Sequence, residues 1–474
     1  MLDALSQPEP WQGFEAALNQ HTIRVYDLPT ERVRVDSTTV SGYWTVTEAG
    51  LFQFGHSKDR RPDLPQVKVM LSVLDPLGMP VATQVVSGER ADDPLYVPAI
   101  RQVREGLQRS GLLYVGDCKM GALATRAWVC AQGDYYLCPL AEKQMPAETR
   151  ERYLQPVWAG ELEPAPIYRQ NAEGQVEQIA VGFEREVAMT QEVEGHLITW
   201  TERHLVVRSL QHADALEKGL RTRLAQAQAE LRRLNERKKG KKRLTSSSEL
   251  EQAAQGILKR HRVAGLLKVA VIDQVQERPV RAYGKRPATV RREHLLSLQV
   301  QVDQPMVAEA TRRFGWRVYA TNQSAAALPL EKAVLAYRDE YLVERGFGRL
   351  KGRPLSLTPM YLQSDQRATG LIRLLSIGLR VLSLTEFQVR RRLAEQKGRL
   401  AGLYAGNPKR TTSRPTAEAL LESFKEITLS VITLSQQTLR HLTALSELQK
   451  QILALLDFPT DIYDRLTAIS PQPP

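Results

Sequence analysis

The strongest structural signal in this chain of 474 residues is the stretch Arg32-Val33-Arg34-Val35-Asp36-Ser37-Thr38-Thr39-Val40. Its apolar residues stand between polar ones, and this pattern predicts a β-strand with one face in a core. Asp36 lies where the apolar run stops. A carboxylate in that position is held by the sheet and faces outward.

Two later segments bring further carboxylates to the same place. Leu112 to Val115 is an apolar strand that runs into Asp117, and a predicted helix far downstream carries Glu344. Carboxylate oxygens are the ligands that hard divalent cations prefer. Acids from strand, strand and helix that converge on one spot predict a site for two such cations.

The segment from Arg32 to Ala141, which contains Asp36 and Asp117, has the composition of a mixed α/β core. From Arg32 to Ala141 the predicted order is strand, strand, strand, helix, strand, helix, strand. The segments after the first strand are Gln66–Leu74, Met79–Ser87, Tyr96–Ser110, Leu112–Val115, Ala122–Ala131 and Asp134–Leu140. Residues 1–31 are interpreted as a lead-in with a short helix near 11–18. Acids at strand ends are typical of sites in open α/β sheets.

The overall composition favours a phosphate-bearing partner over an acidic small substrate. Lys and Arg outnumber Asp and Glu by 65 to 53, a formal charge of +12. Three cysteines without paired zinc spacing favour buried thiols in a reducing compartment. We find no uninterrupted apolar run of membrane-spanning length and no signal-peptide pattern, so a cytoplasmic protein is expected.

Residues 142–325 differ in character, with strand-like runs around a basic helical arm at 213–263. Between Glu217 and Arg243 there are eleven basic and three acidic residues. A solvated helix face and a contact with a nucleic-acid backbone explain this cluster equally well. The candidate DNA-binding residues at its tip are Lys238, Lys239, Lys241 and Lys242.

The chain after residue 328 is predicted to be mostly helical. A single helix from Val334 to Lys351 would carry Tyr337, Glu340, Glu344, Phe347 and Lys351 within a wedge of roughly 80°. Two amphipathic helices, 417–429 and 436–456, are expected after a linker.

In this order of motifs the chain resembles the DDE transposases of bacterial insertion sequences, the cut-and-paste branch with a β-rich insertion before the last acid. The matching segments are 35–40, 55–59, 61–66, 114–117, 320–322, Tyr337, 343–347 and 350–351. The resemblance spans about Arg32 to Leu393.

The resemblance implies an α/β, ribonuclease-H-like mixed sheet flanked by helices, interrupted by a β-rich and helical insertion domain, with a helical carboxy-terminal region. The implied domains are a lead-in (1–31), the first part of the catalytic core (32–141), the insertion (142–325), the second part of the core (326–395) and a carboxy-terminal region (396–474).

The resemblance also implies a function and its partners. Asp36, Asp117 and Glu344 would bind two Mg²⁺ or Mn²⁺ ions and catalyse cleavage and strand transfer of DNA. The partner would be double-stranded DNA, as element terminal repeats and as target, bound by a homodimer without any membrane.

Further residues are expected to contact that DNA. Lys351 would pair with a phosphate, and Tyr337 would pack on a sugar or phosphate. Glu340 departs from the basic or amide residue that the family commonly carries there, and Arg338 is expected to substitute for it. A second group in a short loop near Asp36 consists of His56, Lys58 and Arg61; its alternative is a capped turn with solvated charges.

Relatives that form DNA hairpins stack a flipped base on a tryptophan of the insertion. Trp158, Trp200 and Trp316 lie in that segment, and Trp200 is the first candidate, although core packing is the commoner role of a tryptophan.

Asp36 arrives sooner than in relatives that carry an amino-terminal recognition region, which indicates a shortened copy. Besides an active transposase, two hypotheses therefore remain: an inactive DNA-binding remnant, and a ribonuclease-H-like nuclease that cuts without joining.

Overall fold

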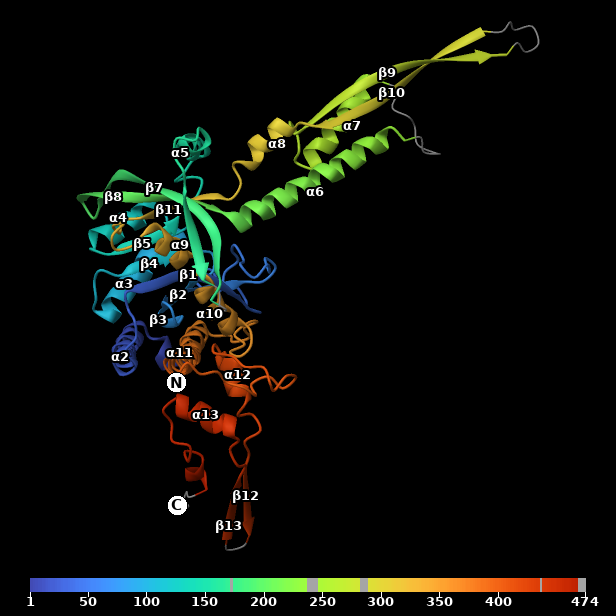
Figure 1. The fold of residues 1–474 in the computed structure, drawn as a ribbon. Coiled ribbons are helices and arrows are strands. Elements are labelled where there is room, and N and C mark those ends of the chain that lie inside the picture. The colour runs from blue at the N-terminus through green and yellow to red at the C-terminus, as the bar shows by residue number, and fades with distance from the viewer. Residues whose placement is uncertain (171–173, 237–245, 282–288, 435–436, 468–474) are drawn as a thin grey trace. The chain divides into compact units, whose positions relative to one another are not determined.

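The computed structural model describes residues 1–170, 174–236, 246–281, 289–434 and 437–467 (Figure 1). The chain forms two compact units. Unit 1 contains Met1–Met145, Glu186–Arg203 and Ala320–Pro474, and unit 2 contains Pro146–Arg185 and His204–Tyr319.

Unit 1 is built on a mixed sheet. Its first five strands are β1 (Arg32–Ser41), β2 (Gln66–Leu74), β3 (Met79–Ser87), β4 (Leu113–Gly116) and β5 (Tyr135–Pro139). Their spatial order is β3-β2-β1-β4-β5. β2 pairs antiparallel with both β1 and β3, whereas β4 pairs parallel with both β1 and β5. The expected ribonuclease-H-like mixed sheet is confirmed.

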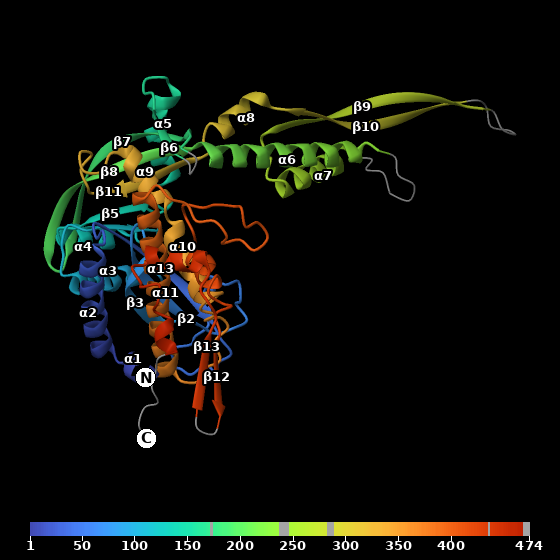
Figure 2. The same cartoon turned by 60° about the horizontal axis from the view of Figure 1, so that its bottom comes forward.

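Helices cover both faces of this sheet, as Figure 2 shows for α3 (Tyr96–Leu107) and α10 (Tyr341–Lys351). Val33 and Val35 of β1 pack with α3, whereas Leu71 and Val73 of β2 pack with α10. All nine residues of β2 are buried because apolar helices lie on either side. Full burial of each such aliphatic side chain contributes about 1.5–3 kcal/mol.

Asp36 lies on the α10 side of the sheet. It pairs across the ladder with Leu71, whose side chain joins the α10 cluster, and paired residues share a face. Because side chains alternate along β1, Val33 and Val35 face the core on the α3 side of the sheet, and Asp36 faces α10, the helix that carries Glu344.

The amino-terminal segment contains more helix than predicted. It forms α1 (Leu2–Ser6) and the 19-residue α2 (Pro8–Tyr26), so the expectation of one short helix is wrong. The buried face of α2 consists of Trp11, Glu15, Asn19 and Thr22. Three of these four side chains are polar, which hid the helical periodicity in the sequence.

The predicted helix Val334–Lys351 is two helices. α9 (Leu330–Arg338) ends at Asp339, and α10 begins after Glu340. The prediction that Tyr337 and Glu344 share one face of one helix is therefore wrong. Each short helix has an apolar face with helical spacing. A break of one or two residues between two such helices cannot be detected from the spacing of apolar residues.

The next helix, α11 (Asp365–Glu395), is long and apolar enough to cross a membrane by length and composition. Half of its 18-residue apolar window is buried inside unit 1, and it buries Arg373, Arg380 and Glu386. Buried charges with partners are typical of a core helix of a folded domain.

The carboxy-terminal part of unit 1 also differs from the expectation of two helices. It contains α12 (Ala417–Glu422), the hairpin β12 (Leu429–Leu434) and β13 (Gln437–Leu442), and α13 (Glu447–Leu455). Val431, Ile432 and Thr433 of β12 are β-branched, which favours a strand in the gap between the two predicted helices, and β13 takes the beginning of the second predicted helix. α4 (Leu123–Ala131) and two 3₁₀ turns, Asp93–Leu95 and Asp464–Leu466, complete the unit.

Unit 2 contains strands and a helical arm. Its strands β11 (Trp316–Thr321), β8 (His196–Ser209), β7 (Val176–Val193) and β6 (Ala165–Gln170) are neighbours in that order; β7, β8 and β11 continue into unit 1. The remaining elements are α5 (Ala147–Trp158), α6 (Leu210–Leu234), α7 (Ser247–Arg260), β9 (Leu267–Val280), β10 (Thr289–Val302) and α8 (Gln304–Thr311).

The predicted helical phase of the arm is confirmed. Leu220, Leu224 and Leu231 of α6 pack on Leu250 and Ile257 of α7 in one apolar cluster. The candidate DNA-binding residues Lys238, Lys239, Lys241 and Lys242 lie outside the described residues.

Candidate active site

Asp36 and Asp117 are brought together by the register of two parallel strands. The last aligned pair of β1 and β4 is Val35 with Gly116, and the two aspartates follow directly. Neighbouring strands are about 4.8 Å apart, so residues at the same level are adjacent. Gly116 permits this approach, because a Cβ there would meet Met120 Sδ at 2.7 Å and Val35 O at 3.1 Å.

The carboxylate of Asp117 is held in a defined orientation at the end of β4. The Tyr96 hydroxyl donates to Asp117 Oδ1 at 2.6 Å, and the backbone N–H of Lys119 donates to the same oxygen at 2.8 Å. The second bond is the Asx-type turn that often ends a strand. Burial, with the charges of Asp117 and Asp36 as lesser causes, holds the Tyr96 pKa well above its usual value, so this hydroxyl remains a donor.

Asp36 lies in a largely buried position beside other acids. Burial raises its pKa to about 7; Lys58 acts in the opposite direction, and Asp117 and Glu340 add to the rise. The Ser37 N–H donates to Asp36 Oδ1 at 2.6 Å. A buried carboxylate with acidic neighbours is stabilised in its charged form by an added cation.

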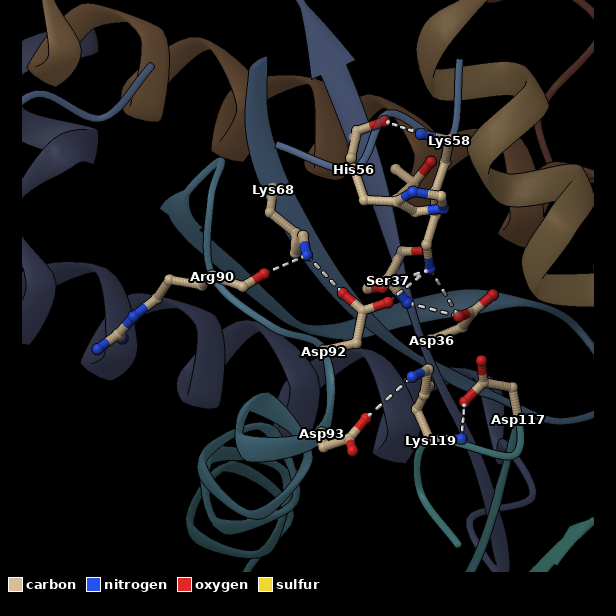
Figure 3. Close-up of polar contacts among 12 residues, drawn as sticks. Asp36, Ser37, His56, Lys58, Lys68, Arg90, Asp92, Asp93, Asp117 and Lys119 are labelled. Atoms are coloured by element: carbon tan, nitrogen blue, oxygen red, sulfur yellow. Dashed lines mark hydrogen bonds and ion pairs between the residues drawn. The ribbon is translucent and has the colours of Figure 1, made fainter. Parts of the chain in front are cut away.

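Lys58 is the lysine nearest to Asp36 among the contacts drawn in Figure 3. Its ammonium lies 3.8 Å from Asp36 Oδ1 and 3.3 Å from Asp92 Oδ2, and it donates to the Ser37 carbonyl at 2.8 Å. Asp92 is also paired with the buried Lys68 at 2.6 Å. Lys58 is therefore directed into the site, beside the first acid, and its expected contact with DNA stays a prediction.

The third acid of the cavity between these strands is Glu340. Asp36, Asp117, Glu340 and Tyr337 line this cavity of about 10 Å³, close to the space that one water molecule needs. Glu340 is half-buried, and its carboxylate is hydrogen-bonded by Tyr337. Glu344 lies one turn further along α10, is exposed, and is not among the described residues that line the cavity.

The sequence placed Glu340 on one face of a predicted helix with Glu344 and marked it as a departure from a family pattern, but did not predict it as a residue of the cavity. Burial raises the Glu340 pKa most, and the charges of Glu344 and Asp117 raise it further. Four carboxylates therefore influence one another here. The acidic character of position 340 was visible in the sequence, but the helix break that places it was not.

Arg34 connects the strand of Asp36 to the helix before Glu340. Its guanidinium donates to Asp75 Oδ2 at 2.6 Å and to the carbonyl oxygen of Ala336 in α9. The side chain is buried and paired, so it anchors the end of α9 against β1. Arg338, expected to contact DNA, is the last residue of α9 and is half-buried.

Lys351 is near the site and is paired within the protein. Its ammonium donates to Asp59 Oδ1 at 2.5 Å and to Thr38 Oγ1 at 2.9 Å. Thr38 lies two residues after Asp36 on the same face of β1, about 7 Å along the strand. Lys351 is thus held close to the acids.

The other two residues of the basic loop are on the surface. Arg61 forms an exposed ion pair with Asp63 at 2.7 Å. His56 is exposed, and its carbonyl accepts from Gln66 Nε2 at 3.1 Å. Of the loop residues expected to contact DNA, only Lys58 reaches the acids.

The three candidate tryptophans occupy packed positions. Trp200 is 8% exposed, and its indole N–H donates to the Tyr136 hydroxyl at 2.8 Å. Trp316 is equally buried, and the Arg312 guanidinium lies 4.2 Å from the ring centroid of Trp158. These contacts give no support to a base-stacking role for Trp200.

The residues at the cavity fit divalent cations by their chemistry. Carboxylates supply the oxygen donors that Mg²⁺ and Mn²⁺ take, and their mutual repulsion is relieved by a cation. Within the described ranges, no three His, Cys, Asp or Glu side chains are already arranged to hold an ion. Binding would therefore require these side chains to turn toward one another.

Comparisons with known proteins were made for sequence and structure. A family model described as "Transposase DDE domain" matches residues 28–379. No curated protein gives a significant match. A solved structure described as a piggyBac transposase synaptic complex with hairpin DNA is similar at 8% identity, a TM-score of 0.21, 38% coverage of this chain and 31% coverage of that chain.

The structural likeness is too low to carry an argument, and the aligned part spans less than a third of that transposase chain. The family match stands independently, since it covers most of the chain and includes Asp36, Asp117 and Glu344. This chain therefore belongs to the transposase DDE domain family.

Proposed function

We propose that this protein is a DNA transposase that cuts the ends of an insertion sequence and joins them to target DNA in the bacterial cytoplasm. The observation that carries the proposal is that Asp36, in the middle of β1, and Asp117, directly after β4, lie at the same level of adjacent strands, beside the helix with Glu344, in a chain of this family.

Asp36, Asp117 and Glu344 are the proposed ligands for Mg²⁺ or Mn²⁺. Two such ions, when bound, activate the attacking oxygen and stabilise the leaving oxygen of a phosphodiester. The same three carboxylates serve successive steps in which the nucleophile is first water and then a 3′-hydroxyl.

The neighbouring side chains orient the acids and bind substrate. Tyr96 fixes one oxygen of Asp117, which leaves the other oxygen of that carboxylate for a cation. Lys58 maintains positive charge at Asp36. Lys351, held by Asp59, would exchange this partner for a DNA phosphate as the duplex enters.

Double-stranded DNA is the proposed partner, bound by a homodimer. The formal charge of +12 favours a phosphate backbone. His56, Arg61 and Tyr337 are proposed to contact DNA near the acids. Lys238, Lys239, Lys241 and Lys242 are proposed to contact the DNA backbone without reading its sequence.

A second candidate function is a DNA-binding protein that does not cut. The exposed position of Glu344, one turn beyond the cavity that Asp36 and Asp117 line, favours it. A nuclease that cuts but does not join is a variant of the first candidate.

Incubation of the full chain with Mg²⁺ and DNA from the flanks of the encoding element would separate these functions. We expect cut ends and products joined to a target plasmid, both lost in Asp117→Asn. Cutting without joining would indicate a nuclease. Binding without either reaction would contradict the proposal and favour the second candidate.

A further inference from the structure

We propose that Glu340 provides a fourth carboxylate for the metal site, beside Asp36, Asp117 and Glu344. The inference rests on the proposed function. It assigns a metal-binding role to a residue at which the family commonly carries a basic or amide side chain.

The position of Glu340 in the fold is the first reason. It lines the same small cavity as Asp36 and Asp117, whereas Glu344 is exposed. The backbone leaves helical geometry at Asp339 and resumes it at Glu340, the N-cap residue directly before α10. This break places the carboxylate of Glu340 toward the strands.

The orientation of Glu340 is the second reason. Tyr337, which lines the same cavity, is hydrogen-bonded to the Glu340 carboxylate. Arg34 holds the preceding turn through the Ala336 carbonyl. These contacts fix the carboxylate at the mouth of the cavity, so Tyr337 is a positioning residue in this inference.

The charge at the site is the third reason. Asp36, Asp117, Glu340 and Glu344 carry four negative charges when ionised, which two divalent cations would balance. Lys58 and Arg34 offset only part of this charge, because Lys58 is shared between Asp36 at 3.8 Å and Asp92 at 3.3 Å, and Arg34 is paired with Asp75 at 2.6 Å. Glu340 and Glu344 are four residues apart, a spacing that puts both carboxylates on one side of a helix. Together they would hold the ions from the helix while Asp36 and Asp117 hold them from the sheet.

The test is a titration of full-length protein with Mn²⁺ at pH 8, in which free Mn²⁺ is followed by electron paramagnetic resonance. Glu340→Gln is nearly isosteric and removes the charge. We expect it to weaken at least one Mn²⁺ site by about tenfold or more, since even groups that only support metal ligands contribute about 10- to 100-fold. Glu340→Asp should restore part of the affinity, and Tyr337→Phe should cause a smaller loss.

The matched control is Glu331→Gln, which alters an exposed glutamate in the first turn of α9 and should leave Mn²⁺ binding unchanged. Circular dichroism and the melting temperature of each variant establish that it is folded. Wild-type affinity and ion number in folded Glu340→Gln would overturn the inference, as would tighter binding.

The titration separates this inference from the proposed function. If Asp117→Asn loses Mn²⁺ and Glu340→Gln does not, only the role of Glu340 falls. If the wild-type protein binds Mn²⁺ through Glu340 but neither cuts nor joins DNA, the transposase proposal falls and the fourth ligand stands. If the wild-type protein binds no Mn²⁺, both fall.

Discussion

At the scale of single residues, Asp36 combines burial with repulsion from other acids. Its pKa rises from 3.8 to about 7, chiefly because burial disfavours the charged carboxylate. An acid with a raised pKa binds its proton more tightly in the folded protein than in the unfolded chain. The stability that Asp36 contributes to the metal-free protein is therefore lost as the pH rises from about 4 to about 7.

The raised pKa of Asp36 predicts how the stabilising effect of divalent cations depends on pH. A cation competes with the proton at Asp36, so Mn²⁺ should raise the melting temperature more at pH 8 than at pH 5.5. Differential scanning fluorimetry at both pH values, with and without Mn²⁺, measures the difference. Asp36→Asn is the control and should remove most of it. Equal shifts at the two pH values in the wild-type protein would count against cation binding at Asp36.

Asp36 and Asp117 could be predicted as neighbours, because one lies within and the other directly after an apolar strand that is recognisable by composition. The side chains that contact them could not be predicted. Tyr96, which donates to Asp117, lies in a predicted helix, and Lys58, whose ammonium is 3.8 Å from Asp36 Oδ1, lies in a loop whose conformation no periodicity specifies. The role of Glu340 depends on a helix break that leaves no mark in the pattern of apolar residues.

At the scale of elements, the end of the β7–β8 hairpin in unit 1 is fixed by a buried polar network. Glu202 of β8 accepts from Arg126 of α4 and from the Tyr136 hydroxyl of β5, and Trp200 donates to Tyr136. Both charged side chains are almost fully buried. Breaking such a pair leaves one buried charge without compensation.

Glu202→Ala is therefore predicted to lower the free energy of unfolding by about 3–5 kcal/mol. Urea unfolding followed by tryptophan fluorescence measures the loss, because Trp200 is part of the network. The control is Glu422→Ala, which removes an ion pair with Lys425 whose side chains are 69% and 67% exposed. Its cost should be small by comparison, because solvent screens the charges of both exposed side chains. Similar losses in both variants would show that the buried network is not the anchor.

Elements with clean apolar alternation or clean helical phase were predictable, such as β1 and the α6 helix of the arm. Elements whose buried face is polar were not. α2 buries Glu15 and Asn19, and burial raises the Glu15 pKa to about 7 although Arg380 lies close. In the carboxy-terminal region, residues 437–442 lie within a predicted helix but pair with β12 as the strand β13.

At the scale of the whole molecule, the positive charge of the sequence predicts a phosphate-bearing partner, whereas composition contains no information on how the chain divides into compact units. Unit 1 takes residues from three separate stretches, and the segment Glu186–Arg203 within it interrupts unit 2. Such a division depends on contacts between residues far apart in sequence, and a single sequence holds no record of them.

The measurement that tests the central claim most directly follows DNA binding and DNA cutting together in wild-type protein and Glu344→Gln, with Glu331→Gln as the control. If Glu344 holds metal for phosphoryl transfer, Glu344→Gln should bind element-end DNA with wild-type affinity in Mn²⁺ and cut it no faster than buffer alone. Wild-type cutting by Glu344→Gln, or equal losses of binding and cutting, would contradict a metal-dependent transposase that acts through this acid.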